Sequence, residues 1–241
     1  ILGRWGGSAM GRMLVLFCCL LAGQAHAGAW PRASGTGFAS LSTWQGIGGT
    51  DSYTALFAEY GLIPRITLGL DAGRSVSGQT KTVAFLRAPF GQSFGWLIAA
   101  EIGLGEIAGQ PVLRPGLSFG RNITTRHGTG WIAVDTLLEV DMAAQEIDLK
   151  TDITLGFTPS RADAPPSDWT MMLQLQTGLV DLHNSVLLFR TEGTLPDPAF
   201  LRIVPSVTYR LNDRMHLEFG LFHALQGSDE RGVKIGLWST F

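Results

Sequence analysis

The sequence predicts an all-β fold: a transmembrane antiparallel up-and-down β-barrel of about twelve strands. Apolar and polar residues alternate with a period of two from residue 35 onward. The chain holds 31 glycines, and only 16% of its residues are charged, compared with roughly 25% in an average soluble domain. Beyond its first 27 residues it has no apolar run as long as the roughly 18 residues of a helical membrane span.

Residues 1–27 have the pattern of a signal peptide. A short basic start at Met10–Met13 precedes an apolar core of nine residues, Leu14–Ala22, and Ala25–Ala27 fits a small-x-small cleavage site. Nine apolar residues are too few to span a bilayer. We therefore expect translation to begin at Met10 or Met13 and cleavage to leave Gly28 as the new N-terminus.

The expected mature chain, residues 28–241, excludes several function classes. Both cysteines, Cys18 and Cys19, lie in the leader, so the mature chain has no thiol, disulfide or cysteine metal site. Loss of Arg4 and Arg12 leaves 16 basic and 20 acidic residues, a net charge of −4. This is not the basic footprint of a nucleic-acid-binding protein. We expect no nucleic-acid partner, no cofactor and no metal.

The clearest expected strand lies within residues 145–157. Odd positions from Ile147 to Phe157 are apolar or threonine, whereas Asp148, Lys150 and Asp152 lie on the other face. This run of eleven residues suits a membrane strand of about 9–11 residues better than a soluble strand of about 5–6. The same division recurs in residues 65–73, 96–105, 131–142 and 215–221. A lipid-facing exterior and a polar lumen require it.

Counting such runs predicts twelve strands, an even number as in single-chain bacterial barrels: residues 35–45, 51–62, 65–76, 80–90, 93–106, 111–122, 129–142, 145–159, 168–183, 199–212, 214–226 and 231–241. Tight periplasmic turns are expected at 62–65, 90–93 and 211–214, and looser outer loops at 75–80, 105–111, 183–199 and 226–231. Both termini then lie in the periplasm. The long, proline-rich segment 158–168 is an exception, because it falls on the side of the short turns.

The chain ends in an alternating segment with an aromatic last residue. Val233, Ile235, Leu237, Ser239 and Phe241 share one face, and Trp238 is out of phase with them. This end resembles the C-terminal assembly signal of outer-membrane proteins. The resemblance implies that the barrel-assembly machinery recognises Phe241, and that the barrel resides in the lipid of a bacterial outer membrane.

Three segments, Ala58–Gly69, Val204–Leu211 and Leu237–Phe241, extend this resemblance. They are similar to a wider group of proteobacterial outer-membrane barrels, including those named after phenol-degradation gene neighbourhoods. The resemblance implies a role in moving small molecules across the outer membrane. It names no substrate and transfers no functional residue.

The predicted strand phases direct one set of polar residues into the lumen, since Arg or Lys on the lipid face would cost roughly 2–4 kcal/mol at the midplane. This set is Glu59, Asp71, Glu101, Arg114, Asp135, Glu139, Asp148, Lys150, Asp152, Arg202, Arg210, His216, Glu218 and Lys234. The residues either pair into salt bridges that fill a closed structural barrel, or line a selective path for a small polar solute. Acidic residues outnumber basic ones, so an open pore would show a mild cation preference.

An enzyme is the third alternative. His183 and Ser185 form the one local cluster suggestive of an outer-membrane lipid hydrolase, with Asp181 able to orient the histidine. The surroundings of known lipase motifs are absent, so no catalytic residue is assigned. Most tryptophans lie near the expected strand ends and are interpreted as a girdle at the membrane interface: Trp30, Trp44, Trp96, Trp131, Trp169 and Trp238.

Overall fold

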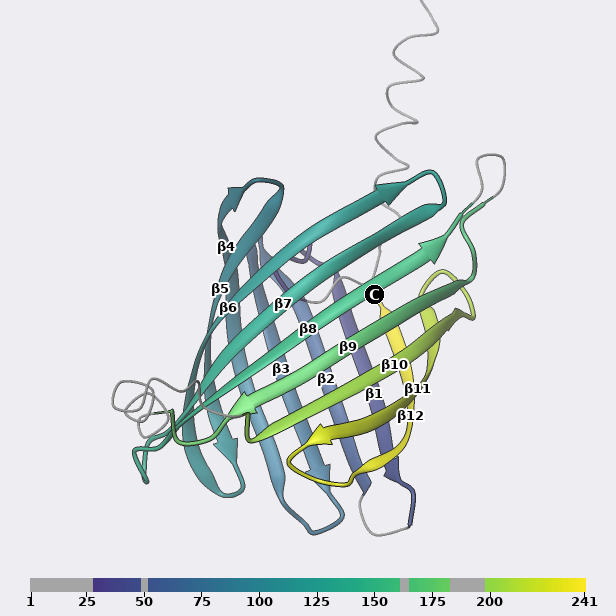
Figure 1. The fold of residues 1–241 in the computed structure, drawn as a ribbon. Coiled ribbons are helices and arrows are strands. Elements are labelled where there is room, and N and C mark those ends of the chain that lie inside the picture. Colours follow the sequence, from purple (N-terminus) through teal and green to yellow (C-terminus); the bar gives the residue numbers. More distant parts are fainter. Residues whose placement is uncertain (1–27, 49–51, 161–164, 183–197) are drawn as a thin grey trace, which may run out of the picture.

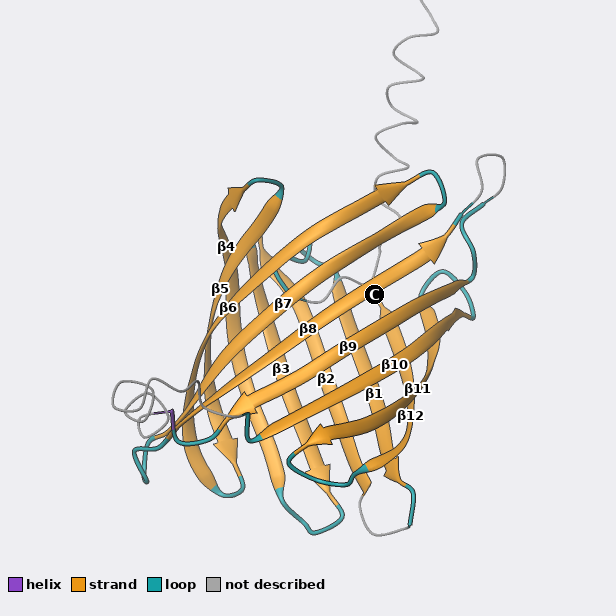
Figure 2. Cartoon of the chain, in the orientation of Figure 1, coloured by secondary structure: helices purple, strands orange, loops and turns teal. Residues whose placement is uncertain are grey.

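The computed structural model describes residues 28–48, 52–160, 165–182 and 198–241. The predicted signal peptide, residues 1–27, lies outside the described residues. The described chain forms twelve strands, each antiparallel to its neighbours in the sequence, and β1 pairs with β12 to close the barrel (Figures 1 and 2). The predicted fold class and strand number are confirmed.

The strands have 10–16 residues each and cover most of the described chain. Their bounds are β1 (Gly37–Gly46), β2 (Ser52–Ile63), β3 (Ile66–Ser75), β4 (Thr80–Ser93), β5 (Trp96–Ile107), β6 (Gln110–Thr125), β7 (Gly128–Asp141), β8 (Ile147–Pro159), β9 (Trp169–Leu179), β10 (Phe200–Arg210), β11 (Met215–Gln226) and β12 (Arg231–Thr240). No helix in the described part of the chain is long and apolar enough to cross a membrane.

Burial is inverted relative to a soluble domain. Large apolar side chains face outward: Leu41, Ile102 and Phe219 are 51%, 48% and 45% exposed. Charged side chains face inward, and Arg114 on β6 is 1% exposed and contacts Asp71 on β3 across the interior. A barrel surrounded by lipid requires this arrangement, because its outer face must be apolar and only its lumen can hold charge.

Two predicted connections are placed differently in the structure. Strand β4 continues through the predicted turn at 90–93, and the chain reverses at Phe94-Gly95, with φ of 49° and 79°. The predicted loose loop at 105–111 is a two-residue turn, Ala108-Gly109, with φ of 51° and 82°. Positive φ at both central residues is typical of type I′ turns, whose twist matches that of the flanking strands. The glycine at the second position of each turn, Gly95 and Gly109, was the available signal in the sequence.

The barrel has two distinct ends. The terminal end carries the start of β1, the C-terminus and the connections at 64–65, 94–95, 126–127, 160–168 and 211–214. The loop end carries the connections at 47–51, 76–79, 108–109, 142–146, 180–199 and 227–230. The proline-rich segment thus lies at the terminal end, as the strand count predicted.

Phe241 lies beside the start of β1. Its carbonyl oxygen accepts a hydrogen bond from Gly37 N at 2.6 Å, and the residue as a whole is 61% exposed. The last residue is therefore held by the strand that closes the barrel. Its role as an assembly signal stays a prediction.

Glycines on the lumen face make room for aromatic rings. A Cβ added at Gly69 would lie 2.0 Å from the Phe85 ring on the adjacent strand, and one at Gly156 would lie 2.2 Å from the Trp131 ring. The rings lie across the neighbouring backbone because no side chain stands there. This packing accounts for part of the high glycine content.

The same packing corrects the interpretation of the tryptophans. Trp131 is buried in the interior, Trp44 packs on Phe222, and Trp238 donates a hydrogen bond to Glu218. These three side chains therefore belong to the lumen and not to a girdle. Strand phase was the available signal, since Trp238 shares the parity of Lys234 and not that of the outward-facing Ile235.

Candidate functional site: the lumen

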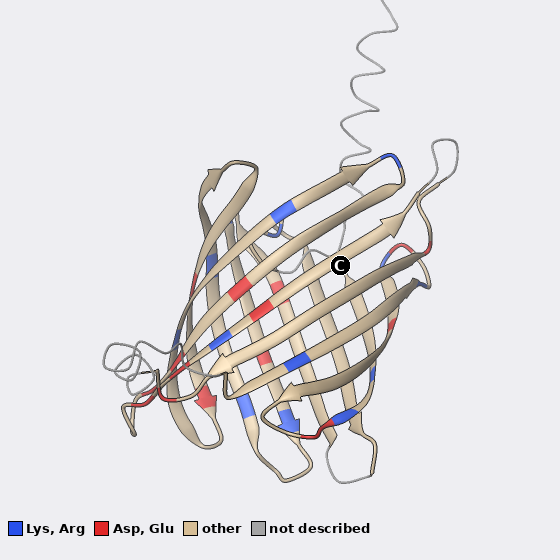
Figure 3. Cartoon of the chain, in the orientation of Figure 1, with Lys and Arg blue, Asp and Glu red and all other residues tan. Residues whose placement is uncertain are grey.

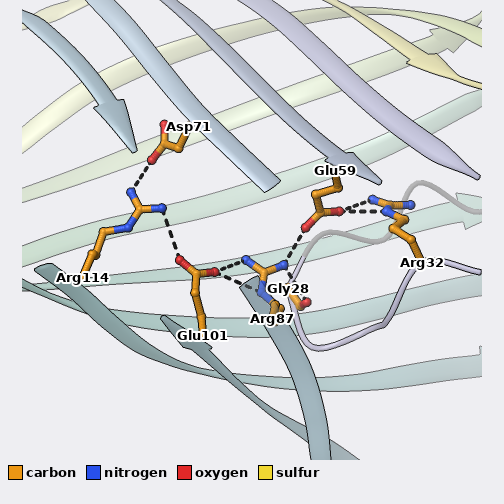
Figure 4. A network of polar contacts seen from close by, with 7 residues as sticks. All are labelled: Gly28, Arg32, Glu59, Asp71, Arg87, Glu101 and Arg114. Atoms are coloured by element: carbon orange, nitrogen blue, oxygen red, sulfur yellow. Dashed lines mark hydrogen bonds and ion pairs between the residues drawn. The ribbon is translucent and has the colours of Figure 1, made fainter. Parts of the chain in front are cut away.

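A continuous chain of ion pairs crosses the lumen between β2 and β6 (Figure 4). We call it the ionic belt. Its members alternate in charge along the contacts: Arg32, Glu59, Arg87, Glu101, Arg114, Asp71 and Lys81.

Arg87 and Arg114 are the bridging cations of the ionic belt. Arg87 reaches Glu59 and Glu101, each at 2.6 Å. Arg114 reaches Glu101 at 3.2 Å and Asp71 at 2.6 Å. Each guanidinium therefore joins two carboxylates from other strands, which the fixed fork of donors on arginine permits and the single ammonium of lysine does not.

The ionic belt is deeply buried and rests on an aromatic ring. Glu59, Glu101, Arg87 and Arg114 are each at most 7% exposed. The guanidinium carbons of Arg87 and Arg114 lie 4.9 Å and 5.7 Å from the centre of the Phe85 ring. Desolvating a charge is costly unless opposite charges and hydrogen bonds replace the lost water. The shared carboxylates and the face of Phe85 supply those interactions.

The N-terminal segment, residues 28–34, fills the terminal end of the lumen. Ala29 is fully buried, and Arg87 Nη1 donates a hydrogen bond to Gly28 O at 2.9 Å. Arg32 pairs with Glu59 at 2.7 Å, and its backbone N donates to Thr67 Oγ1 at 3.0 Å. The segment thus contributes both side chain and backbone to the ionic belt.

The loop end of the lumen holds a cavity of about 890 Å³. Its lining mixes hydroxyls, amides, aromatic rings, cations and carboxylates, including Ser42, Trp44, Tyr53, Gln176, Arg202 and Glu230. Lys81 belongs both to this lining and to the ionic belt. The belt therefore separates the cavity from the N-terminal segment.

The opposite wall of the barrel carries isolated ion pairs. Lys234 pairs with Glu218 at 2.8 Å and lies 4.9 Å from the centre of the Trp44 ring. Lys150 pairs with Glu139 on the adjacent strand, and Arg202 pairs with Glu230 at 2.5 Å. Each of these ion pairs joins only two charges. Lys150 and Arg202 are more exposed than the arginines of the belt, whereas the Lys234–Glu218 pair is buried. Figure 3 shows basic and acidic positions interspersed along the strands.

The fourteen predicted lumen residues divide into three groups. Nine take part in the belt or in the pairs of the opposite wall. Two, Asp135 and Asp152, face each other on β7 and β8, and the remaining three lie toward the two ends of the barrel. Asp148 accepts a hydrogen bond from Asp181 N at 3.1 Å near the loop end. Arg210 pairs with Asp168 at 2.6 Å on the exposed rim of the terminal end, opposite His216 on β11. Their role in selectivity stays a prediction.

Sequence reasoning missed three lumen cations: Arg32, Lys81 and Arg87. With these three, the five basic residues of the predicted set become eight, equal to its eight acidic residues. The cavity lining adds Arg231, Asp229 and Glu230, so nine basic residues face ten acidic ones and the acidic excess behind the predicted cation preference is small. Lys81 and Arg87 share a face with Val83 and Phe85, so polarity did not mark the lumen side of β4.

The described structure does not test the cluster considered for hydrolysis, because His183 and Ser185 lie outside the described residues. The backbone N of Asp181 donates a hydrogen bond to Asp148 Oδ1. Within the described ranges, no group of three or more His, Cys, Asp or Glu residues could hold a metal ion.

No protein-family model matches the chain, and no curated protein matches it. Solved structures do. The chain is similar to the NanC porin, with a TM-score of 0.57 at 9% identity over 83% of this chain and 98% of that one. It is also similar to the KdgM porin, alone and in complex with disordered oligogalacturonate, with a TM-score of 0.55 at 10% identity over 86% of this chain and 99% of that one. At these identities the similarity shows the fold: the chain has the barrel architecture of these porins.

Proposed function

We propose that this chain is an outer-membrane channel or transporter for small solutes. The cavity at the loop end carries the proposal, because about 890 Å³ of space inside a membrane barrel is enough to hold a small organic molecule. The barrel architecture shared with the KdgM and NanC porins supports it. The similarity of residues 58–69, 204–211 and 237–241 to barrels from phenol-degradation gene neighbourhoods suggests the same role.

The lining suggests a solute with both polar and ring-shaped parts. Trp44, Tyr53 and Phe222 present ring faces, and Ser42 and Gln176 present hydrogen-bonding groups. Most ligand sites combine an apolar surface with a few placed polar groups. Because basic and acidic residues of the lumen are nearly equal in number once Arg32, Lys81, Arg87 and the cavity-lining charges are included, we expect weak charge selectivity.

The proposed orientation places the terminal end in the periplasm and the loop end outside. Three connections at the terminal end have two residues, as expected of periplasmic turns. In this orientation the cavity faces the medium from which solute is taken up. Export would follow from cleavage after Ala27, and insertion from recognition of Phe241 by the assembly machinery.

A closed structural barrel is the second candidate. The observation that favours it is the N-terminal segment, which lies across the terminal end of the lumen together with the ionic belt. Conductance of the purified protein in a planar bilayer separates the two candidates. A channel gives discrete single-channel steps, whereas a closed barrel gives none, even at high voltage.

Two substitutions on β6 test whether the barrel is embedded in a lipid bilayer. Leu117 lies at the middle of β6 on the outer face, and Ile123 lies on the same face near the terminal end. Leu117→Arg is expected to destabilise the barrel in lipid by roughly 2–4 kcal/mol, and Ile123→Arg by about 0–1 kcal/mol. Urea unfolding in lipid vesicles measures both. If Leu117→Arg and Ile123→Arg reduce the stability equally, the middle of the bilayer does not lie at the middle of the barrel.

A further inference from the structure

One acidic pair in the lumen lacks a cation. Asp135 on β7 faces Asp152 on β8 in the strand register, and Asp135 Oδ1 is buried without a hydrogen-bond partner. Gln174 donates to Asp152 Oδ2 at 3.3 Å, but an amide carries no charge. Within the described part of the chain, neither carboxylate forms an ion pair. Two facing carboxylates in a buried site need either a nearby positive charge or a proton on one of them.

The neighbouring ionic belt has no cation to spare for this pair. The donors of Arg87 go to Glu59, to Glu101 and to the carbonyl of Gly28. Arg114 and Lys81 are directed to Asp71, and Arg114 also to Glu101. The belt and the acidic pair together contain four basic and five acidic groups, so one acidic group has no basic counterpart.

The backbone of Gly28 lies against Asp135. A Cβ built on Gly28 would be 2.9 Å from Asp135 Oδ1 and 3.1 Å from Oδ2, so the Gly28 backbone is in the immediate vicinity of this carboxylate. Two contacts hold this part of the chain in place. Arg87 binds the carbonyl of Gly28 (Figure 4). The Trp30 ring occupies the space where a Gly120 side chain would stand, at 2.6 Å from its Cβ position.

We propose that the α-ammonium of Gly28, created when the leader is removed, is the missing cation and binds Asp135 and its neighbour Asp152. Hydrolysis of the Ala27–Gly28 peptide bond adds one water, leaves a carboxylate on Ala27 and frees the Gly28 amine, which takes up a proton. Before cleavage this nitrogen is a neutral amide with a single hydrogen. After cleavage it has three donors and a positive charge, which a buried carboxylate binds through charge-assisted hydrogen bonds.

Cleavage of the leader would therefore supply the last charged group of the lumen, the α-ammonium of Gly28. Before cleavage, the Gly28 position offers Asp135 at most one neutral donor, and the leader remains attached to the segment that must enter the barrel. After cleavage the balance is five basic to five acidic groups. This inference rests on the proposed cleavage at Ala27–Gly28, and it does not depend on whether the barrel conducts.

The test uses the chain exported with its own leader in a Gram-negative host and purified from the membrane. Intact mass first establishes whether the mature chain begins at Gly28. The folded barrel is then treated briefly with an amine-reactive ester and digested with trypsin. The N-terminal tryptic peptide, residues 28–32, contains no lysine, so any label on it reports the α-amine alone.

We expect the α-amine to react at least about tenfold more slowly in the native barrel than in Asp135→Asn, because the charge-assisted hydrogen bonds to Asp135 hold the amine protonated and away from the reagent. Asp148→Asn is the matched control: Asp148 lies on β8 near the loop end, and this substitution should leave the rate unchanged. Equal rates in the native chain and Asp135→Asn would overturn the inference, as would a mature chain that begins elsewhere. The second result would also refute the proposed cleavage, whereas the first would not.

A measurement on the native chain covers the case in which Asp135→Asn does not fold. The pH dependence of labelling gives the pKa of the α-amine in the barrel and in the isolated peptide 28–32. Ion pairing with Asp135 and Asp152 raises this pKa, whereas burial alone, or repulsion from Arg87, lowers it. A pKa in the barrel that is equal to or below that of the peptide would refute the proposed pair.

Discussion

The two ends of the lumen are filled differently, although the same twelve strands of the described chain enclose both. At the terminal end, the N-terminal segment and the ionic belt occupy the space between the strands. At the loop end, a cavity of about 890 Å³ remains. The barrel wall therefore does not determine whether the lumen is open. The inward-facing side chains and one short segment ahead of β1 determine it.

The difference between the two ends follows from the length and charge of the side chains that face inward. Strands β2–β6 direct long charged side chains inward, and Glu59, Arg87 and Arg114 reach across to one another. The lining of the cavity includes shorter uncharged groups, such as the amides of Gln174 and Gln176 on β9 and the hydroxyl of Ser42 on β1. A twelve-stranded barrel is wider than the eight-stranded ones that side chains alone can fill. Short polar side chains therefore leave space, whereas paired arginines with an added segment close it.

The largest effect is expected from removing residues 28–33, so that the leader is joined directly to Ser34. This change deletes Arg32 and the backbone that binds Arg87, and the terminal end of the lumen should open. Single-channel recording should give a conductance clearly above that of the native chain. Circular dichroism checks that the strands remain. An unchanged conductance would mean that the segment does not limit the path.

Arg87→Met tests the ionic belt itself. Removing this cation leaves Glu59 and Glu101 buried with half of their ion pairs, and breaking a buried pair in this way typically costs about 3–5 kcal/mol. Urea unfolding in detergent or lipid measures the loss. If Arg87→Met is as stable as the native barrel, the belt does not stabilise the closed end.

Gly69→Ala tests the aromatic support of the belt. The added Cβ would lie 2.0 Å from the Phe85 ring, which lies beneath Arg87 and Arg114. Forced overpacking of this kind costs roughly 1–3 kcal/mol. Gly91→Ala on β4 is the control, because nothing lies within 4 Å of its Cβ position. Similar unfolding midpoints for the two variants would show that Phe85 shifts at little cost.

Sequence reasoning predicted the barrel well because its wall is built from local alternation. Residues such as Glu59, Glu101 and Glu218 stand out between apolar neighbours, and each is buried in the lumen. Arg87 was missed because Val83 and Phe85 occupy the lumen face of the same strand, which removes the alternation. Arg32 was missed because it precedes the first strand, and its pairing with Glu59 depends on a contact 27 residues away.

The cavity was beyond sequence reasoning for a related reason. Its lining comes from both ends of the chain, with Trp44 on β1 beside Phe222 on β11. Which side chains meet there depends on the stagger between strands around the whole barrel, which no single strand encodes. The alternation therefore predicts which residues face inward but not which of them leave space between them.

The smallest effect is expected at the rim of the terminal end. Arg210 pairs with Asp168 at 2.6 Å, as short as the contacts of Arg87, but both side chains are largely exposed to solvent. Exposed pairs contribute only about 0–1 kcal/mol, since water and salt screen them. Arg210→Met should therefore shift the urea midpoint little, and added salt should abolish the shift, whereas the Arg87→Met effect should persist in salt. If Arg87→Met and Arg210→Met lower the free energy of unfolding equally, burial in the lumen does not strengthen the ion pairs of the belt. The difference between the closed terminal end and the hollow loop end must then depend on the N-terminal segment alone.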